Sequence, residues 1–256
     1  MRRFLTRALT ILALHTTSTR ADPRLDALVT AYPDQLAGYS NSEVIWKDGT
    51  RMAATDGRTK TFNELLDHPD IEDQFAIAYP LGAVLKPPAV NEDPGRIRNE
   101  PFFIKMYGDC QRGEVTGRLK PVAWMPNRGG GTIMATAVNG VSDKLSEISR
   151  ELETLPSSMT PYLVPTAGTY NCRTIDKTSR LSVHAFGAAI DIAVRFGDYW
   201  LWSEDRDGTL TWRNRIPMAI VEIFERYGFI WGGKWYHYDT LHFEYRPELI
   251  GLGKKG

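Results

Sequence analysis

The sequence of 256 residues has no excess of charge of either sign, because 31 Lys and Arg balance 31 Asp and Glu. A strongly basic surface is the usual electrostatic footprint of a protein that binds nucleic acid or an anionic membrane, so neither partner is expected. Internal repeats and low-complexity stretches are not evident. Apolar residues make up 42% and charged residues 24% of the chain, which excludes a disordered chain or a coiled-coil rod. The composition predicts a globular protein and gives no indication of its oligomeric state.

Long apolar runs are also lacking near the N-terminus. The run Ala8–Leu14 is far shorter than the ~20 residues that a transmembrane helix needs. Three arginines precede it, and small residues occupy Thr19 and Ala21, the two positions that a signal peptidase reads. This layout is typical of a signal peptide over residues 1–21, cleaved after Ala21; a frayed amphipathic N-terminus is the alternative. The remaining chain has 27 basic and 31 acidic side chains, a net charge of −4, and we expect a periplasmic or secreted protein.

Cysteine is scarce, with only Cys110 and Cys172, and no Cys-x-x-Cys spacing indicates a metal site. An exported protein meets an oxidising environment, in which a pair of cysteines usually forms a disulfide. Closing a loop of about 60 residues stabilises a fold by about 4 kcal/mol in the chain-entropy description. We therefore predict a disulfide between Cys110 and Cys172, with two buried thiols as the alternative.

Strand and helix patterns are mixed along the chain without regular alternation, which favours an α+β fold. Residues 22–130 are rich in Pro and Gly and form an N-terminal region of unknown role. Packing of this region on a C-terminal domain over residues 131–256 is one interpretation. The glycines at 129–131 lack the Lys-Ser/Thr of a phosphate-binding loop, so they predict a turn. The patterns predict helices at 61–66, 141–155 and 215–227, and strands at 44–46, 132–138, 188–194, 199–202, 229–231 and 241–245.

Histidine is scarce too, and three of the five histidines lie in the last third of the chain. His184 precedes Asp191 by seven residues, a spacing that places two side chains on opposite faces of a flat strand. Gly187 permits a bend or bulge that turns both inward. Asp191 lies within Ala-Ala-Ile-Asp-Ile-Ala, where an unpaired carboxylate is costly and a metal ion would favour its burial. A His184–Asp191 pair satisfied within the core is the alternative.

A second polar cluster, Asp239-Thr240-Leu241-His242-Phe243-Glu244, lies in an aromatic segment. Two histidines, one aspartate and a water complete a tetrahedral Zn²⁺ site with one open position, which is the pattern of catalytic zinc. Such a site also needs a carboxylate that is not a ligand and acts as general base. Asp239, three residues before His242, is the candidate for this role.

Together these motifs resemble a known family. Ser-x-His-x-x-Gly-x-Ala-x-Asp from Ser182, Trp-Gly-Gly-x-Trp from Trp231 and Asp-x-x-His-Phe-Glu from Asp239 are similar to the zinc D-alanyl-D-alanine carboxypeptidase and L-alanyl-D-glutamate peptidase family. The resemblance covers residues 168–249. It implies the hedgehog/DD-peptidase-like α+β fold for the peptidase domain, with residues 22–130 as a loop-rich N-terminal extension.

Residue by residue, the resemblance implies Zn²⁺ ligation by His184, Asp191 and His242, and catalysis by Asp239. The L-alanyl-D-glutamate branch carries Asp at this position, whereas many other members carry Glu. The family also has an arginine that stabilises the developing oxyanion, within a Gly-Tyr-Arg-like segment. Residues 168–173 look like a variant of that segment, which makes Arg173 the candidate.

Several neighbouring residues have two interpretations each. Ser182 hydrogen-bonds the substrate or braces the His184 loop. Trp235 lines a substrate cleft or packs in the core, as does Trp231. Glu244 orients His242 from behind or is a solvated strand residue. His237 is expected at the surface or behind the ligands.

The sequence thus predicts a zinc metallopeptidase, a carboxypeptidase or an endopeptidase, that cleaves the stem peptides of peptidoglycan. A non-catalytic zinc-containing module that binds the cell wall is the first alternative, because the hedgehog domain keeps zinc without peptidase activity. An exported lysin or toxin with the same chemistry is the second.

Overall fold

The computed structural model describes residues 21–83, 86–203 and 210–253, so the predicted signal peptide lies almost wholly outside the described residues. The helices are α1 Pro23–Ala31, α2 Phe62–Asp67, α3 Glu100–Tyr107, α4 Val141–Leu152, α5 Thr160–Leu163, α6 Met218–Arg226 and α7 Pro247–Gly253. The strands are β1 Leu36–Ser40, β2 Glu43–Trp46, β3 Arg51–Ala53, β4 Leu119–Ala123, β5 Thr132–Thr136, β6 Ala189–Asp191, β7 Phe229–Trp231 and β8 His242–Tyr245. Three small antiparallel sheets and separate helices confirm the α+β class.

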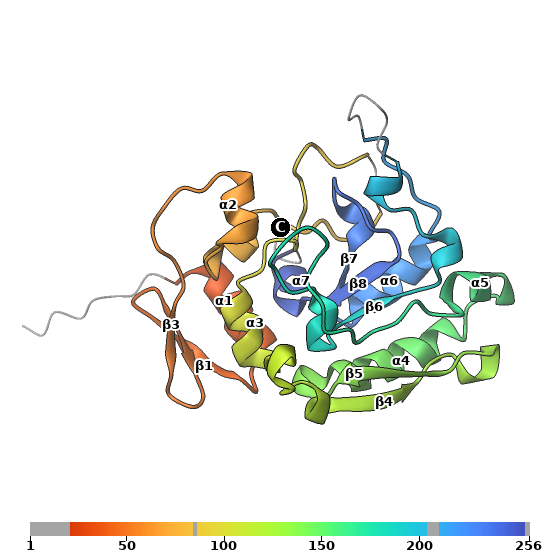
Figure 1. Ribbon diagram of the computed structural model, residues 1–256, viewed down its shortest axis with the longest axis horizontal. Coiled ribbons are helices and arrows are strands. Elements are labelled where there is room, and N and C mark those ends of the chain that lie inside the picture. The colour runs from red at the N-terminus through yellow and green to blue at the C-terminus, as the bar shows by residue number, and fades with distance from the viewer. Residues whose placement is uncertain (1–20, 84–85, 204–209, 254–256) are drawn as a thin grey trace, which may run out of the picture.

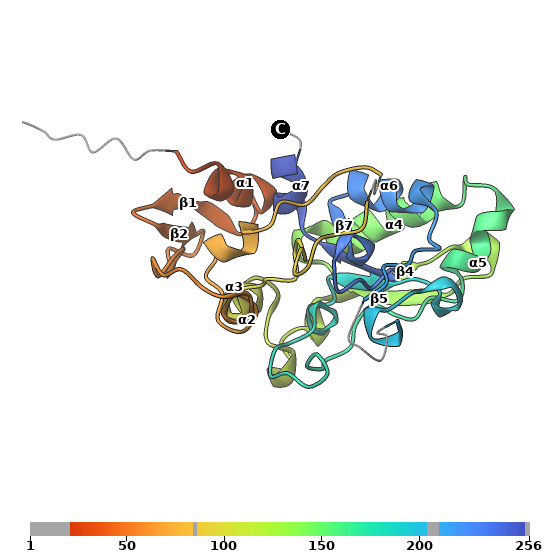
Figure 2. The ribbon, with the colours of Figure 1, turned by 90° about the horizontal axis from the view of Figure 1, so that it is seen from above.

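The N-terminal and C-terminal halves of the chain lie side by side and share one core. In Figure 1, α1, α2 and β1–β3 lie on one side of the molecule, and β4–β8 with α4–α6 lie on the other. Helix α7 near the C-terminus returns to α1 near the N-terminus, as both views show (Figures 1 and 2). The Tyr32 hydroxyl donates to Glu248 at 2.6 Å across this contact. One apolar cluster, from Leu25 to Tyr245, runs through both halves.

Local signals explain the short elements of the N-terminal region. Thr61 caps α2 and exchanges hydrogen bonds with Glu64 in a capping box, as the predicted helix requires. Strands β2 and β3 pair in antiparallel register through the predicted Asp-Gly turn, where Gly49 has a φ of +83°. Asn99 caps α3, and its side chain accepts from the Phe102 amide at 2.9 Å.

The sheet that carries the predicted ligands has the strand order β6-β8-β7. Its antiparallel register places Asp191 directly opposite His242. Helix α6 covers this sheet, and the Phe224 ring stacks on Phe243 with ring centroids 3.9 Å apart. Because all three residues of β7 are fully buried, the sheet is anchored in the core on this side.

The predicted boundary at residue 130 falls inside a hairpin. Strand β4 lies before it and β5 after it, and the two pair over five residues, from Leu119↔Thr136 to Ala123↔Thr132. Helix α4 packs on both strands. The division into two regions stays a prediction, but this hairpin joins them.

Several of the predicted elements need correction. The strand predicted at 188–194 is only three residues long, β6 Ala189–Asp191, and Val194 begins a 3-10 helix. The segment 199–202, predicted as β-like, forms a 3-10 helix over Trp200–Trp202, because Tyr199 makes only an isolated bridge to Asp239 and no neighbouring strand continues the pairing. The predicted helix at 215–227 begins only at Met218, since Pro217 is extended (ψ 134°) and serves as the N-cap. Gly228 follows it with a φ of +86°, as a C-terminal glycine should.

Candidate metal centre and catalytic cleft

The three predicted zinc ligands meet at one point. His184 Nε2 lies 3.1 Å from Asp191 Oδ1 and 3.2 Å from His242 Nδ1, and His242 Nδ1 lies 2.9 Å from Asp191 Oδ1. Ligand atoms around a tetrahedral zinc ion are separated by about 3.3 Å, given bond lengths near 2.0–2.1 Å. Both imidazoles are buried, with 4% and 7% of their residue surfaces exposed. The donor set and its spacing therefore fit a metal ion such as Zn²⁺.

His184 reaches this point from a 3-10 turn, not from a strand. The turn Val183–Phe186 ends at Gly187, whose φ of +65° reverses the chain before β6 begins. A side chain at Gly187 would also approach the Leu119 side chain to 2.7 Å. The bend that the sequence analysis expected at Gly187 is thus present.

The second nitrogen of His184 is already engaged. Nδ1 donates to the Thr169 carbonyl at 2.5 Å, and Nε2 is directed at Asp191. A backbone carbonyl behind a histidine is a common way to select the tautomer that binds metal.

In His242 the two ring nitrogens have exchanged roles compared with His184: Nε2 contacts the protein and Nδ1 faces the metal site. Nε2 donates to Glu244 Oε2 at 3.1 Å. Burial opposes ionisation of Glu244, but Arg98, His242 and Arg246 outweigh this effect and lower the pKa of the carboxyl. Glu244 is fully buried, which excludes the solvated alternative and places it behind His242 as the sequence suggested.

Asp239 lies in the wall of the same cavity as the three ligands. Its Oδ1 atom is buried and has no hydrogen-bond partner within the described residues. Burial raises the pKa of Asp239 to about 6, while His242 opposes the shift and Asp191 adds to it. Gly232 allows this placement, because a Cβ atom there would lie 2.5 Å from the Asp239 carbonyl oxygen. The close approach of the Asp239 backbone thus explains why the Trp-Gly-Gly-x-Trp motif has a glycine at position 232.

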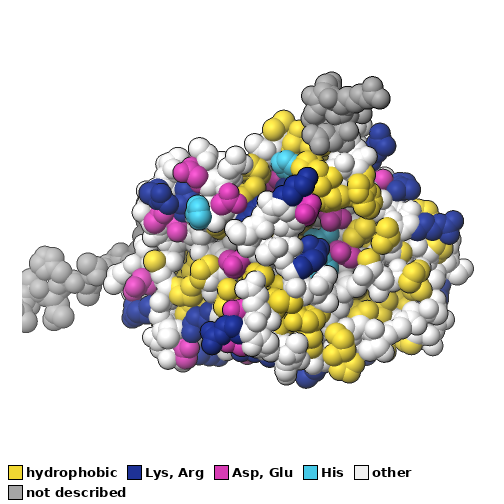
Figure 3. All heavy atoms as spheres, viewed as in Figure 1, with side chains coloured by type: hydrophobic (Ala, Val, Ile, Leu, Met, Phe, Trp, Pro, Cys, Tyr) yellow, Lys and Arg dark blue, Asp and Glu magenta, His cyan; other side chains and the backbone are white. Residues whose placement is uncertain are grey.

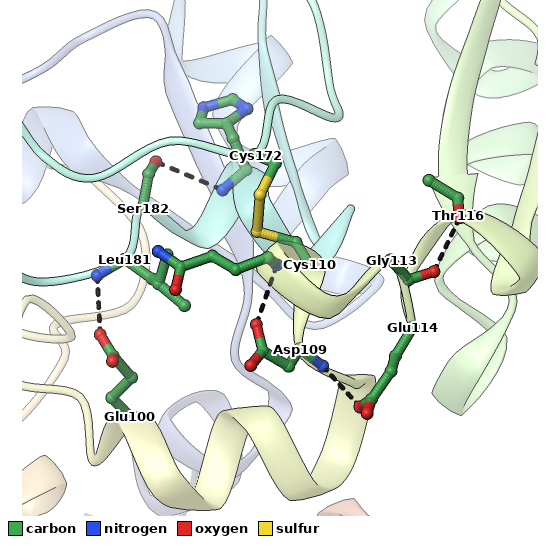
Figure 4. The surroundings of a disulfide bond; sticks show 11 residues. Glu100, Asp109, Cys110, Gly113, Glu114, Thr116, Cys172, Leu181 and Ser182 are labelled. Atoms are coloured by element: carbon green, nitrogen blue, oxygen red, sulfur yellow. Dashed lines mark hydrogen bonds between the residues drawn. A yellow bond between two sulfur atoms is a disulfide. The ribbon is translucent and has the colours of Figure 1, made fainter.

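The disulfide between Cys110 and Cys172 is present, with an S–S distance of 2.06 Å and a Cα–Cα distance of 5.7 Å. It ties the turn after α3 to the residue before Arg173, close to Ser182 (Figure 4). The Ser182 amide donates to the Arg173 carbonyl at 3.0 Å, so the two neighbouring segments are held together.

The remaining predicted residues also border the cavity, which has a volume of about 140 Å³. Arg173 is exposed, and among the described residues its side chain donates only to its neighbour, the Thr174 carbonyl, at 3.3 Å. Ser182 Oγ accepts from the His184 amide at 3.4 Å, a contact that suits the bracing interpretation. Trp235 lies with its ring centroid 5.6 Å from that of His242. Trp231, by contrast, is fully buried and packs in the core.

The N-terminal region supplies cleft residues that the sequence analysis missed. Arg96 and Arg98 line the cavity, and Arg98 binds Glu244 through Nε at 3.1 Å. Asp93 accepts from both the amide and the Nδ1 of His237, at 2.9 and 2.6 Å. The alternation of Arg96 and Arg98 about the buried Ile97 was the available signal, because alternating residues of an extended segment point to one side. In Figure 3, histidine, basic and acidic side chains lie close together near the middle of this face.

The arrangement has the composition of a catalytic zinc site: three protein ligands and a nearby acidic residue in a cavity. Comparison with known proteins agrees, because residues 176–245 match the family model of the D-alanyl-D-alanine carboxypeptidases. This match confirms the predicted resemblance and supports a peptidase. The chain matches no curated protein and no solved structure. None of the described helices has the length and apolar character needed to cross a membrane.

Proposed function

We propose that the protein is a zinc-dependent peptidase that hydrolyses a peptide bond in the peptidoglycan stem, of the L-alanyl-D-glutamate or D-alanyl-D-alanine type. One observation carries the proposal: the ligand atoms of His184, Asp191 and His242 converge in a cavity that also holds the unpartnered carboxylate oxygen of Asp239. When bound, zinc supplies a Lewis acid that polarises a carbonyl oxygen.

Asp239 is the general base in this proposal. Its free carboxylate oxygen accepts a proton from the water that attacks the scissile carbonyl, and the same carboxyl then gives the proton to the leaving amine. In the metal-free chain, burial raises the pKa of Asp239 to about 6, and a base whose pKa lies near the working pH transfers protons efficiently in both directions. A carboxylate already paired with an arginine would be a weaker base, and within the described residues Oδ1 has no such partner.

Arg173 stabilises the negative charge that develops on the carbonyl oxygen. Its side chain borders the cavity and makes one long hydrogen bond within the part of the chain that the structure describes, so most of its donors are available to substrate. Donors that are placed before the reaction and aimed at the developing charge are usually a large part of catalysis. The disulfide beside it limits the movement of the segment.

The same proposal includes the hedgehog/DD-peptidase-like fold for residues 131–256 and export to the periplasm or beyond through the signal peptide of residues 1–21. The resemblance of the motifs supports the fold. The disulfide supports an oxidising compartment.

Digestion of purified sacculi tests the function. The zinc-loaded protein should release muropeptides whose masses identify the bond that is cut, and a chelator should abolish the release. Binding to sacculi without cleavage would instead favour the cell-wall binding module. Cleavage restricted to the walls of other species would favour the lysin or toxin.

A further inference from the structure

A second and larger cavity, of about 470 Å³, adjoins the metal centre. It lies between the N-terminal region and the loop around Arg180, and it shares Arg96, Arg98 and Ile175 with the cavity of the predicted ligands. Its volume is within the range of small-molecule and peptide side-chain sites, about 300–1,000 Å³. The proposed mechanism makes no use of it.

Two arginines line the junction of the two cavities, and the acidic side chains that pair with them are buried in the protein. Arg96 binds Asp93 at 2.9 Å, and Arg98 binds Glu244. Both acidic side chains are 0% exposed, whereas the two arginine side chains keep 17% and 14% of their surface. At this junction the arginine side chains, and not their acidic partners, are therefore in contact with the cavity.

Arg180 faces the same cavity with an incomplete set of partners. Its Nε atom is buried and has no hydrogen-bond partner in the part of the chain that the structure describes. The same Nε atom forms an ion pair with Asp67 Oδ1 at 3.4 Å, but without hydrogen-bond geometry and with a carboxylate that is 56% exposed. Nη1 reaches the Leu66 carbonyl at 3.4 Å. Burial lowers the pKa of Arg180; Asp67 opposes that shift, and the like charges of Arg96 and Arg98 add to it. A cation that is partly desolvated beside two others is stabilised by an incoming anion.

The other acids that line this cavity have partners of their own. Asp56 pairs with Arg58 at 2.7 Å, and Glu100 accepts from the Leu181 amide at 2.7 Å. Of the three arginines at this end of the cavity, Arg96 and Arg98 have buried acidic partners, whereas the acidic partner of Arg180 is the solvent-exposed Asp67.

We propose that this arginine-lined cavity binds a free carboxylate on a residue of the substrate next to the scissile bond, so that the N-terminal region determines specificity. The inference rests on the proposed peptidase function, because stem peptides carry free carboxylates beside their peptide bonds. Arginine binds carboxylates through two parallel hydrogen bonds, a geometry that a carboxamide does not reproduce. Arg180 is the central residue, since it alone of the three lacks a buried acidic partner.

Pairs of stem peptides that differ only by a carboxylate or a carboxamide next to the scissile bond test this. The zinc-loaded wild-type protein should show a kcat/KM for the acid roughly 10- to 100-fold above that for the amide, mainly through KM, because hydrogen bonds to charged groups are worth that factor. In Arg180→Gln the ratio should fall to about one, and Arg180→Lys should restore part of it. The matched control is Arg51→Gln, an exposed arginine on β3 that binds Glu43 at 3.2 Å and should keep the wild-type ratio.

Calorimetric binding of both peptides to the same proteins separates this proposal from the proposed function. If the wild-type protein cleaves neither peptide, the peptidase proposal fails, and a binding preference for the acid that Arg180→Gln removes still supports the carboxylate site. If the wild type cleaves or binds acid and amide equally, or if Arg180→Gln keeps the preference, the carboxylate site is refuted. Thermal unfolding checks that the variant folds, which we expect because Asp67 is solvated without Arg180.

Discussion

Replacing Asp239 by Asn separates the proposed base from the proposed ligands. The amide keeps the shape of the side chain but accepts no proton from water. General-base catalysis contributes about 10²–10⁴-fold in rate, so Asp239→Asn should lose that factor in kcat on a stem peptide while it retains stoichiometric zinc. Asp176→Asn is the matched control, because Asp176 is an exposed aspartate on the wall of the same cavity. It should stay within a few-fold of wild type.

The same substitution should also change stability in a direction that depends on pH. Burial raises the pKa of Asp239 from 3.8 to about 6, and a shift of roughly two units corresponds to about 3 kcal/mol against the ionised form in the folded state. Because the folded protein holds this proton more tightly than the unfolded chain, the penalty is absent below about pH 4 and complete above about pH 6. Asp239→Asn cannot ionise, so the chelated variant should unfold at higher denaturant than chelated wild type at pH 8. The two should be nearly equal near pH 3.5.

Steady-state rates at equal zinc content and denaturant titrations at the two pH values provide both measurements. A variant that hydrolyses the peptide at the wild-type rate would show that Asp239 is not the base. If Asp239→Asn is less stable than wild type at pH 8, the ionised carboxylate of Asp239 has a stabilising partner and does not lower the free energy of unfolding.

Three further predictions follow from the site. Changing His184, Asp191 or His242 to Ala should abolish stoichiometric zinc binding, as measured by elemental analysis, because three protein ligands are usual for a catalytic zinc ion. Full zinc occupancy in all three variants would refute the assignment. Thiol titration of the oxidised protein should find no free thiol, and changing both Cys110 and Cys172 to Ala should lower the free energy of unfolding by about 4 kcal/mol, or less where strain offsets the gain. Arg173→Lys should restore little of the kcat that Arg173→Ala loses, because an ammonium group lacks the planar fork of donors; equal kcat for Arg173→Lys and wild type would contradict the oxyanion role.

The elements that carry their own local signals were predictable from the sequence. Thr61 and Glu64 form a capping box within four residues, and α2 begins where they indicate. The apolar stripe of α4 repeats at helical spacing and is buried as expected. The prediction of a strand at 199–202 was wrong. The aromatic residues of this segment favour a strand, but a strand forms only beside a neighbouring strand, which depends on the tertiary structure.

The ligand set was predictable because its spacing reflects local chain geometry. His184 and Asp191 are separated by one glycine turn, and His242 follows Asp239 within a short segment. The orienting contacts were predictable only where they are also local, as with Glu244 two residues from His242. The Thr169 carbonyl behind His184 comes from another segment and left no signal in residue type, because every residue has a carbonyl.

The sequence shows that Arg96 and Arg98 alternate about Ile97, but it does not show what Arg98 binds, because Glu244 lies 146 residues away in the chain. Arg98 neutralises Glu244, and Glu244 holds the ring of His242, so a residue outside the matched segment 176–245 determines how a proposed zinc ligand is oriented. Without Arg98, Glu244 would keep His242 and Arg246 as partners but lose the arginine that lowers its pKa most, and burial would raise the pKa of the carboxyl that anchors the imidazole. The same short segment places Arg96 in the wall of both cavities. The N-terminal region is therefore part of the cleft, and a peptidase domain cut at residue 131 would lose both Arg98, which binds Glu244 behind His242, and one wall of its binding site.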